Sequence, residues 1–212
     1  MTGFVCNRPV LLTLLATLLL VTACSTHVVV QGSVPTPLVA KIPARVGIYY
    51  SDEFRNFVHQ EKIDQEGSFQ VDFGDQNLSF FQNLMDALFS PAIALDKLPA
   101  EGEPLENLDG LLVPEITRFG FLTPDISGLG FYSVSIHYRL TLYDRQNHKV
   151  TDWTVVGYGK SESSAFGSNK ALSDATMLAI RDGGARIAIE MSEQPAVRKW
   201  LETLQPASGA RP

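Results

Sequence analysis

The sequence predicts an α+β fold: a mixed, mostly antiparallel sheet with a three-strand meander packs against two helices, and a short helix follows at the C-terminus. Apolar and polar residues alternate along 131–143, which is typical of a strand with one buried face. Two other segments, about 76–89 and 169–192, carry apolar residues at helical spacing. The order of strands, helix, strand, three strands and long helix indicates two helices against one mixed sheet.

The domain is expected to open near residue 45 with short elements. Alternating apolar side chains predict two strands, the first from Val46, Ile48 and Tyr50 and the second from Phe69, Val71 and Phe73. Asp75 is a suitable N-cap for the first helix, and Ser90-Pro91 ends that helix. A short strand at 93–95 and a solvated acidic loop with Glu101, Glu103 and Glu106 follow.

The meander comes next, with strands predicted at 110–119, 131–143 and 150–160 and a mobile glycine-rich connection at 120–130. Six residues of the central strand share the face expected to be buried: Tyr132, Val134, Ile136, Tyr138, Leu140 and Leu142. Gly183-Gly184 interrupts the long helix and indicates close packing or a kink. Pro195 suits the first turn of the last helix, whose apolar residues recur at helical spacing.

The N-terminal segment is predicted to be a secretory signal rather than part of the fold. Arg8 precedes an apolar run over 10–21, which ends in Val21-Thr22-Ala23-Cys24. The run is short for a membrane span, although an uncleaved anchor is the alternative. We therefore divide the chain into a signal peptide (1–23), Cys24 with a flexible tether (24–44), a single α+β domain (45–205) and a disordered tail (206–212).

The motif Val21-Thr22-Ala23-Cys24 resembles the lipobox of bacterial lipoproteins. The resemblance implies that signal peptidase recognises Val21, Thr22 and Ala23, and that Cys24 receives diacylglycerol and an N-acyl chain. It also implies a Gram-negative outer-membrane lipoprotein facing the periplasm, because Ser25 replaces the Asp that favours inner-membrane retention. Several acyl chains make such attachment durable. The alternative for part of the tether is that Val28-Val29-Val30 pairs as an edge strand, because valine has a high β-propensity.

Composition narrows the function classes. The 212 residues carry a formal charge of −6, with 23 acidic and 17 basic residues, which argues against general nucleic-acid binding. Two cysteines are too few for a disulfide-stapled small domain or a zinc site of several cysteines. Residues 52–118 hold 14 acidic and 4 basic residues, so this half either meets a basic partner or serves solubility.

No catalytic motif stands out in the sequence. Gly159-Lys160-Ser161 lacks the preceding glycine that a phosphate loop needs, and the four histidines are dispersed. We expect neither enzyme activity, nor a metal, nor a cofactor beyond the lipid on Cys24. Two alternatives remain open: a lipid- or glycan-binding module with a pocket between sheet and helices, and a hydrolase with dispersed catalytic residues in which His137 is the base.

A protein partner in the cell envelope is the expected ligand, in addition to the membrane reached through the lipid. Aromatic and arginine side chains, which are favoured at interfaces, mark the candidate contact surface: Tyr49, Tyr50, Phe54, Arg55, Phe57, Phe121 and Phe131. The alternative is that these aromatics close the ends of the core. Over about 160 residues, the size and element order resemble small periplasmic lipoproteins of the YajG type and ring-forming secretion lipoproteins such as PelC.

Overall fold

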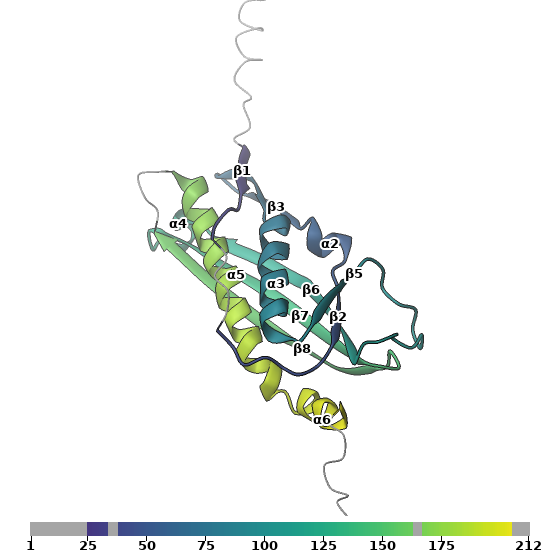
Figure 1. Ribbon diagram of the computed structural model, residues 1–212. Coiled ribbons are helices and arrows are strands. Elements are labelled where there is room, and N and C mark those ends of the chain that lie inside the picture. The colour runs from purple at the N-terminus through teal and green to yellow at the C-terminus, as the bar shows by residue number, and fades with distance from the viewer. Residues whose placement is uncertain (1–24, 34–37, 163–166, 205–212) are drawn as a thin grey trace, which may run out of the picture.

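The computed structural model describes residues 25–33, 38–162 and 167–204, and it confirms the α+β class. The strands form a five-stranded sheet of order β5-β2-β6-β7-β8 and a three-stranded sheet of order β1-β4-β3 (Figure 1). The larger sheet contains β2 (Val46–Tyr49), β5 (Ala92–Leu95), β6 (Gly110–Leu122), β7 (Phe131–Asp144) and β8 (Lys149–Glu162). The smaller sheet contains β1 (Ser25–Val29), β3 (Val58–Ile63) and β4 (Gly67–Asp72).

The predicted meander is confirmed. Strands β6, β7 and β8 pair antiparallel in sequence order, whereas β2 lies parallel to both β5 and β6. The inward residues of β7 are all buried, as the alternation indicates: Tyr132, Val134, Ile136, Tyr138, Leu140 and Leu142. The burial of this face follows from two helices, α3 (Gly74–Leu88) and α5 (Ser168–Glu193), which lie side by side across the sheet (Figure 1).

Glycines allow α5 to lie unusually close to the sheet. A Cβ atom at Gly157 or Gly159 of β8 would collide with main-chain atoms of α5. On the helix, a Cβ atom at Gly183 would lie 2.7 Å from a ring carbon of Tyr138. Gly183-Gly184 therefore serves close packing, and α5 runs through this pair as one helix.

Residues 25–33 of the segment expected to be a flexible tether belong to the fold, which corrects that expectation for them. Strand β1 pairs in parallel with β4 from Ser25 opposite Ser68 onward, and Val28 and Val30 are buried. Beyond the strand, the amide of Gly32 donates a hydrogen bond to Gln76 of α3 (3.1 Å). The physical reason is that the alternating valines bury two apolar side chains while their backbone completes a sheet edge.

Several local predictions also change. Strand β3 and two four-residue helices, α2 (Asp52–Arg55) and α4 (Pro124–Ser127), were not predicted, and α4 lies within the 120–130 connection. Helix α3 begins at Gly74 with Phe73 at the N-cap position, so Asp75 occupies the first turn instead. Gly74 is required there because a side chain would collide with the backbone of residues 55–57.

The acidic loop between β5 and β6 is less solvated than expected. Leu105 and Leu108 are buried and form a second apolar cluster with Leu111 and Val113 of β6. The opposite face of the sheet packs against α3 and α5, so this loop covers part of the face that the helices leave open. The glutamates of the loop remain exposed.

Helix α6 (Pro195–Leu204) ends the described chain, and Pro195 stands at its start as predicted. None of the helices in residues 25–33, 38–162 and 167–204 combines the length and apolarity needed to cross a membrane. The predicted signal peptide (1–23), Cys24 and the predicted tail (206–212) lie outside the described residues.

Candidate functional site: a cleft beside the C-terminal helix

A cleft of about 790 Å³ lies where α6 meets the end of the meander. Its walls come from the start of β6, the β7–β8 turn and one side of α6. The lining residues are Asp109, Asp144, Arg145, Gln146, Val150, Ala196, Lys199, Trp200, Thr203 and Leu204. The volume is within the range of ligand pockets in proteins.

The β7–β8 turn is held in one conformation by Asp144. A carboxylate oxygen of Asp144 accepts hydrogen bonds from the backbone amides of Gln146 and His148, both at 2.9 Å. Asn147 adopts φ 58°, in the left-handed region that Asn tolerates, and its side-chain amide donates to the carbonyl of Ala100 (2.6 Å). The turn is therefore fixed to the acidic loop, and it presents Arg145 at the cleft.

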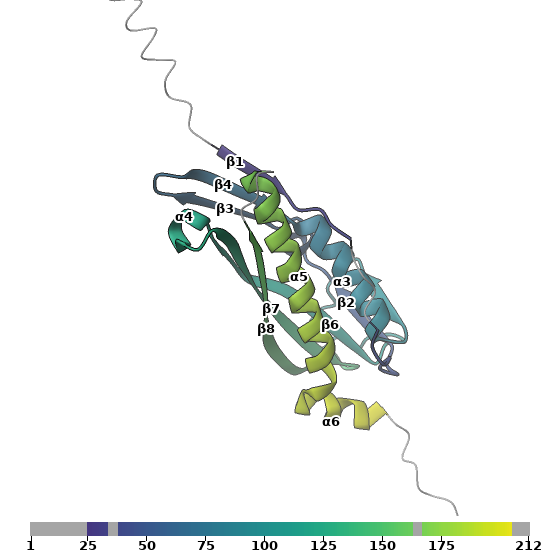
Figure 2. The same cartoon turned by 90° about the vertical axis from the view of Figure 1, so that its left-hand side faces the viewer.

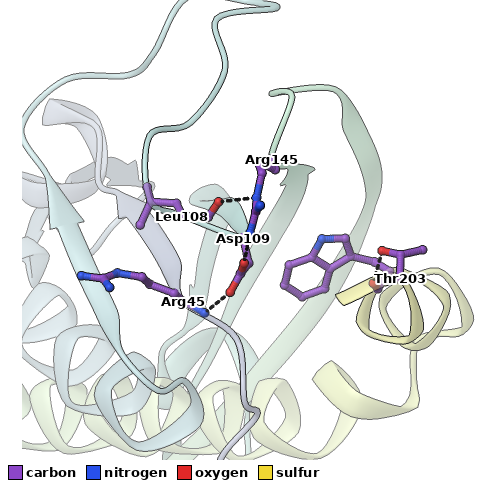
Figure 3. Close-up of polar contacts among 6 residues, drawn as sticks. Arg45, Leu108, Asp109, Arg145 and Thr203 are labelled. Atoms are coloured by element: carbon purple, nitrogen blue, oxygen red, sulfur yellow. Dashed lines mark hydrogen bonds and ion pairs between the residues drawn. The ribbon is translucent and has the colours of Figure 1, made fainter. Parts of the chain in front are cut away.

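Arg145 and Asp109 form the rigid rim of the cleft (Figure 3). Arg145 donates to a carboxylate oxygen of Asp109 at 2.6 Å and to the carbonyl of Leu108 at 3.2 Å. The second carboxylate oxygen of Asp109 accepts the backbone amide of Arg45 at 2.9 Å. Three segments distant in sequence are thus joined at one carboxylate, and both of its oxygens already have partners.

Helix α6 supplies the apolar wall. Val197 and Trp200 are buried, and the Trp200 ring packs so closely on Gly110 that a Cβ there would lie 2.8 Å from the ring. The indole N–H of Trp200 is buried and has no hydrogen-bond partner among the described residues. Thr203 donates its hydroxyl to the Trp200 carbonyl at 2.6 Å, so that hydroxyl serves its own helix.

The cleft combines apolar surface with charged side chains. Trp200, Val150 and Leu204 supply apolar surface, while Lys199 and the Arg145 guanidinium stand beside it. Within the described part of the chain, Lys199 takes part in no ion pair. An apolar floor edged by charged groups, with a tryptophan and an arginine, has the composition of a protein-binding surface.

Three of the seven residues of the contact surface predicted from the sequence are in the core, so the prediction is wrong for these three. Tyr50, Phe54 and Phe121 are buried. The ring of Phe54 stacks on Tyr50 and meets Phe81 of α3 edge-on at 5.0 Å. Burial, followed by the charge of Asp86, raises the pKa of Tyr50 well above its usual value. The chain turns inward at α2, so these aromatics close the core. This agrees with the alternative interpretation of the sequence, in which they close the ends of the core.

The remaining predicted contact residues do not come together. Tyr49 packs on the apolar cluster under the acidic loop, Arg55 donates to the Tyr50 carbonyl at 2.8 Å, and partly buried Phe57 packs against Phe73. Phe131 lies beneath the Lys160 ammonium, 3.7 Å from its ring centroid. Tyr49 belongs to β2, which pairs with the start of β6, whereas Phe131 lies beyond the other end of β6. About 30 Å of strand therefore separates these two residues.

His137, the base considered for a hydrolase, lies on the sheet face turned away from α5. Its cross-strand neighbours are Arg118 and Val156, and its carbonyl accepts the Thr117 hydroxyl at 3.2 Å. The space between the sheet, α3 and α5, where a lipid or glycan pocket was considered, is occupied by the side chains of one continuous core.

Sequence reasoning missed the cleft because its parts are far apart along the chain. In the sequence, Asp109 is one of several acidic residues in a predicted loop. Trp200 is one of several apolar residues in a predicted helix, and Arg145 belongs to a polar turn. The one signal in the sequence was a tryptophan on a short terminal helix, because tryptophan is enriched at binding surfaces.

No family model matches the chain, and no curated protein matches it. Solved structures with a partial likeness include a Xanthomonas campestris protein of family DUF330 (TM-score 0.47, 12% identity, covering 82% of this chain and 99% of that one). A second, from Helicobacter pylori, is described as a homologue of a neuraminyllactose-binding hemagglutinin (TM-score 0.47, 8% identity, 82% and 98% covered). A third, from Caulobacter crescentus, is described as a lipoprotein (TM-score 0.33, 15% identity, 63% and 86% covered).

Proposed function

We propose that this chain is a lipid-anchored protein on the periplasmic side of a Gram-negative outer membrane, and that it is a non-catalytic accessory component that holds a protein partner at the α6 cleft. The lipobox resemblance of Val21-Thr22-Ala23-Cys24 supports the anchor, and Ser25 supports the outer membrane. On this proposal, the covalent lipid on Cys24 is the only non-protein group of the mature chain.

One observation carries the proposal: β1, which follows Cys24 directly in the sequence, and α6, which lines the cleft, are at opposite ends of the molecule (Figure 1). Cys24 directly precedes β1, and the carbonyl of His27 in β1 accepts a hydrogen bond from Asn169 in the first turn of α5. Helix α6 follows the other end of α5, whose 26 residues span about 40 Å. A chain anchored through Cys24 would therefore hold the cleft away from the membrane.

The cleft favours a polypeptide over a small ligand. The Asp109 carboxylate is already paired, while the Lys199 ammonium and apolar surface remain for a partner. A cation beside an open apolar wall suits an extended chain segment that supplies acceptors and one apolar side chain.

Cys24→Ser tests the anchor. We expect the variant to lose fatty-acid labelling completely and to accumulate as uncleaved precursor, because the thiol accepts the diacylglycerol that must precede cleavage. Cys6→Ser is the matched control, since Cys6 leaves with the signal and should not affect labelling. Undiminished labelling of Cys24→Ser in growing cells would contradict the proposal.

Site-specific photo-crosslinking tests the cleft. A photoreactive amino acid at position 199 should give a discrete adduct in intact cells, because this position lines the cleft. Position 202 is the matched control: it is exposed on the same helix but outside the cleft lining. Thr203→Trp should obstruct the cleft beside position 199 and weaken the adduct. Equal adducts from both positions, or an adduct unaffected by Thr203→Trp, would count against a partner at this site.

A further inference from the structure

Three exposed apolar side chains lie together in sequence around α4. Leu122 ends β6, Ile126 lies within α4, and Leu129 follows it, with exposed fractions of 48%, 52% and 65%. We call these three residues the α4 tip. Singly exposed apolar residues are ordinary on protein surfaces. Three of them within eight residues, at one end of a strand pair, indicate a contact surface.

The α4 tip is built into the fold. The Thr123 hydroxyl caps α4 by accepting the amide of Ile126 at 3.2 Å, and Gly128 ends the helix at φ 64°, which is in the left-handed region. Thr123 is itself buried, and its hydroxyl donates to Glu66 at 2.6 Å. The apolar side chains are therefore presented on a fixed turn.

The same contacts place the tip beside the point where the chain would enter the membrane. Glu66 directly precedes β4, and Ser68 of β4 pairs with Ser25, the first residue of β1. Figure 2 shows the start of β1, the β3–β4 hairpin and α4 at the same end of the molecule. Because β1 begins at Ser25, no flexible linker separates the fold from Cys24.

We propose that the α4 tip inserts into the bilayer interface next to the acylated Cys24 and fixes the orientation of the domain on the membrane. The inference rests on the proposed acylation. Lipid on Cys24 brings this end of the domain to the head groups, since adjacent Cα atoms are about 3.8 Å apart. Apolar side chains of interfacial segments settle about 5–10 Å deep, at the boundary of head groups and acyl chains.

Charge identifies the kind of membrane surface that the tip fits. Asp64 and Glu66 lie in the β3–β4 turn, Glu66 bonds to Thr123 at the tip, and Asp125 lies in α4; an anionic head group would repel these carboxylates. The basic residues nearby in the strands are Lys62 of β3 and Lys160 of β8, the latter lying over Phe131. The contact is therefore apolar, suits zwitterionic lipid, and should be insensitive to salt.

The test uses the acylated mature protein, which has lost Cys6 with the signal and carries lipid on Cys24, so that an added cysteine is its only thiol. Ile126→Cys is labelled with an environment-sensitive fluorophore, and the protein is reconstituted into zwitterionic phosphatidylethanolamine–phosphatidylcholine vesicles. Ile189→Cys is the matched control, because Ile189 is 61% exposed and lies near the far end of α5. We expect a blue shift and quenching by spin-labelled lipid at 126, unchanged in high salt, and neither effect at 189.

Each other outcome overturns the proposal. Protein that fails to float with the vesicles would refute the anchor and the inference together. Protein that floats without a shift at 126 would refute the tip insertion alone and leave the anchor standing. A shift at 126 that spin-labelled lipid does not quench would mean that protein, such as a second copy, covers the tip.

Discussion

Gly159→Ala is expected to destabilise the domain by about 3 kcal/mol, the upper part of the usual range for overpacking. Gly159 lies in β8 under α5, and an added Cβ would overlap the Ala175 carbonyl oxygen and lie 2.5 Å from the Ala179 nitrogen. Both obstacles are main-chain atoms, so no rotamer change can relieve the overlap. Helix and strand would have to separate along the most extensive contact between α5 and the sheet.

The measurement is thermal or urea unfolding of the purified mature chain. For a domain of this size, the expected loss corresponds to a fall in Tm of about 6–12 °C. Gly120→Ala is the matched control: it is also a strand glycine of the same sheet, but the nearest atom to its Cβ would be the Ser135 hydroxyl at 3.7 Å. The control should change stability by no more than about 0.5 kcal/mol. Equal effects of the two substitutions would mean that α5 does not pack this closely.

Tyr138→Phe is expected to cost about 1–3 kcal/mol, because it removes the partner of a buried amide. The Tyr138 hydroxyl donates to the Asn77 side-chain oxygen at 2.7 Å, and both residues are fully buried. The Asn77 side-chain nitrogen has no partner among the described residues, so the variant would leave the whole amide unpaired. Desolvation raises the pKa of Tyr138 well above its usual value, which keeps the hydroxyl protonated as a donor.

A double-mutant cycle separates this hydrogen bond from general packing. Asn77→Leu alone should destabilise the domain by a similar amount, since it leaves the tyrosine hydroxyl unpaired. The double variant should be less destabilised than the sum of the single variants, because no buried polar group then lacks a partner. Additive losses in urea unfolding would show that the two side chains do not interact.

The sequence was most informative where a long element has one face in the core. The alternation along β7 correctly identified its six inward residues, because strand side chains point to opposite faces and the buried face must be apolar. Both long helices were predicted for the same reason at the helical period. Strand β3 was missed because most of its side chains are exposed and polar on both faces. Helices α2 and α4 are too short to show any period.

The aromatic residues after β2 show where composition misleads. Tyr50 and Phe54 look like interface residues in sequence, yet they fill the junction beside α3. Aromatic side chains serve cores and interfaces equally well, so only the direction in which the chain turns at α2 decides between them. The cleft shows the converse, since Asp109, Arg145 and Trp200 carry no shared pattern until the fold brings them together.

The sequence by itself determined the α+β class and the lipobox expectation at Cys24, because both depend on local order along the chain: the period of apolar residues and the motif behind an apolar run. The tertiary structure alone decided that residues 25–33 belong to the fold rather than to a tether. Pairing of β1 with β4 depends on residues more than 40 positions away, and local propensity cannot report such a partner. That pairing also places the start of β1 at the same end of the molecule as α4, whereas α6, which lines the cleft, lies at the far end of α5.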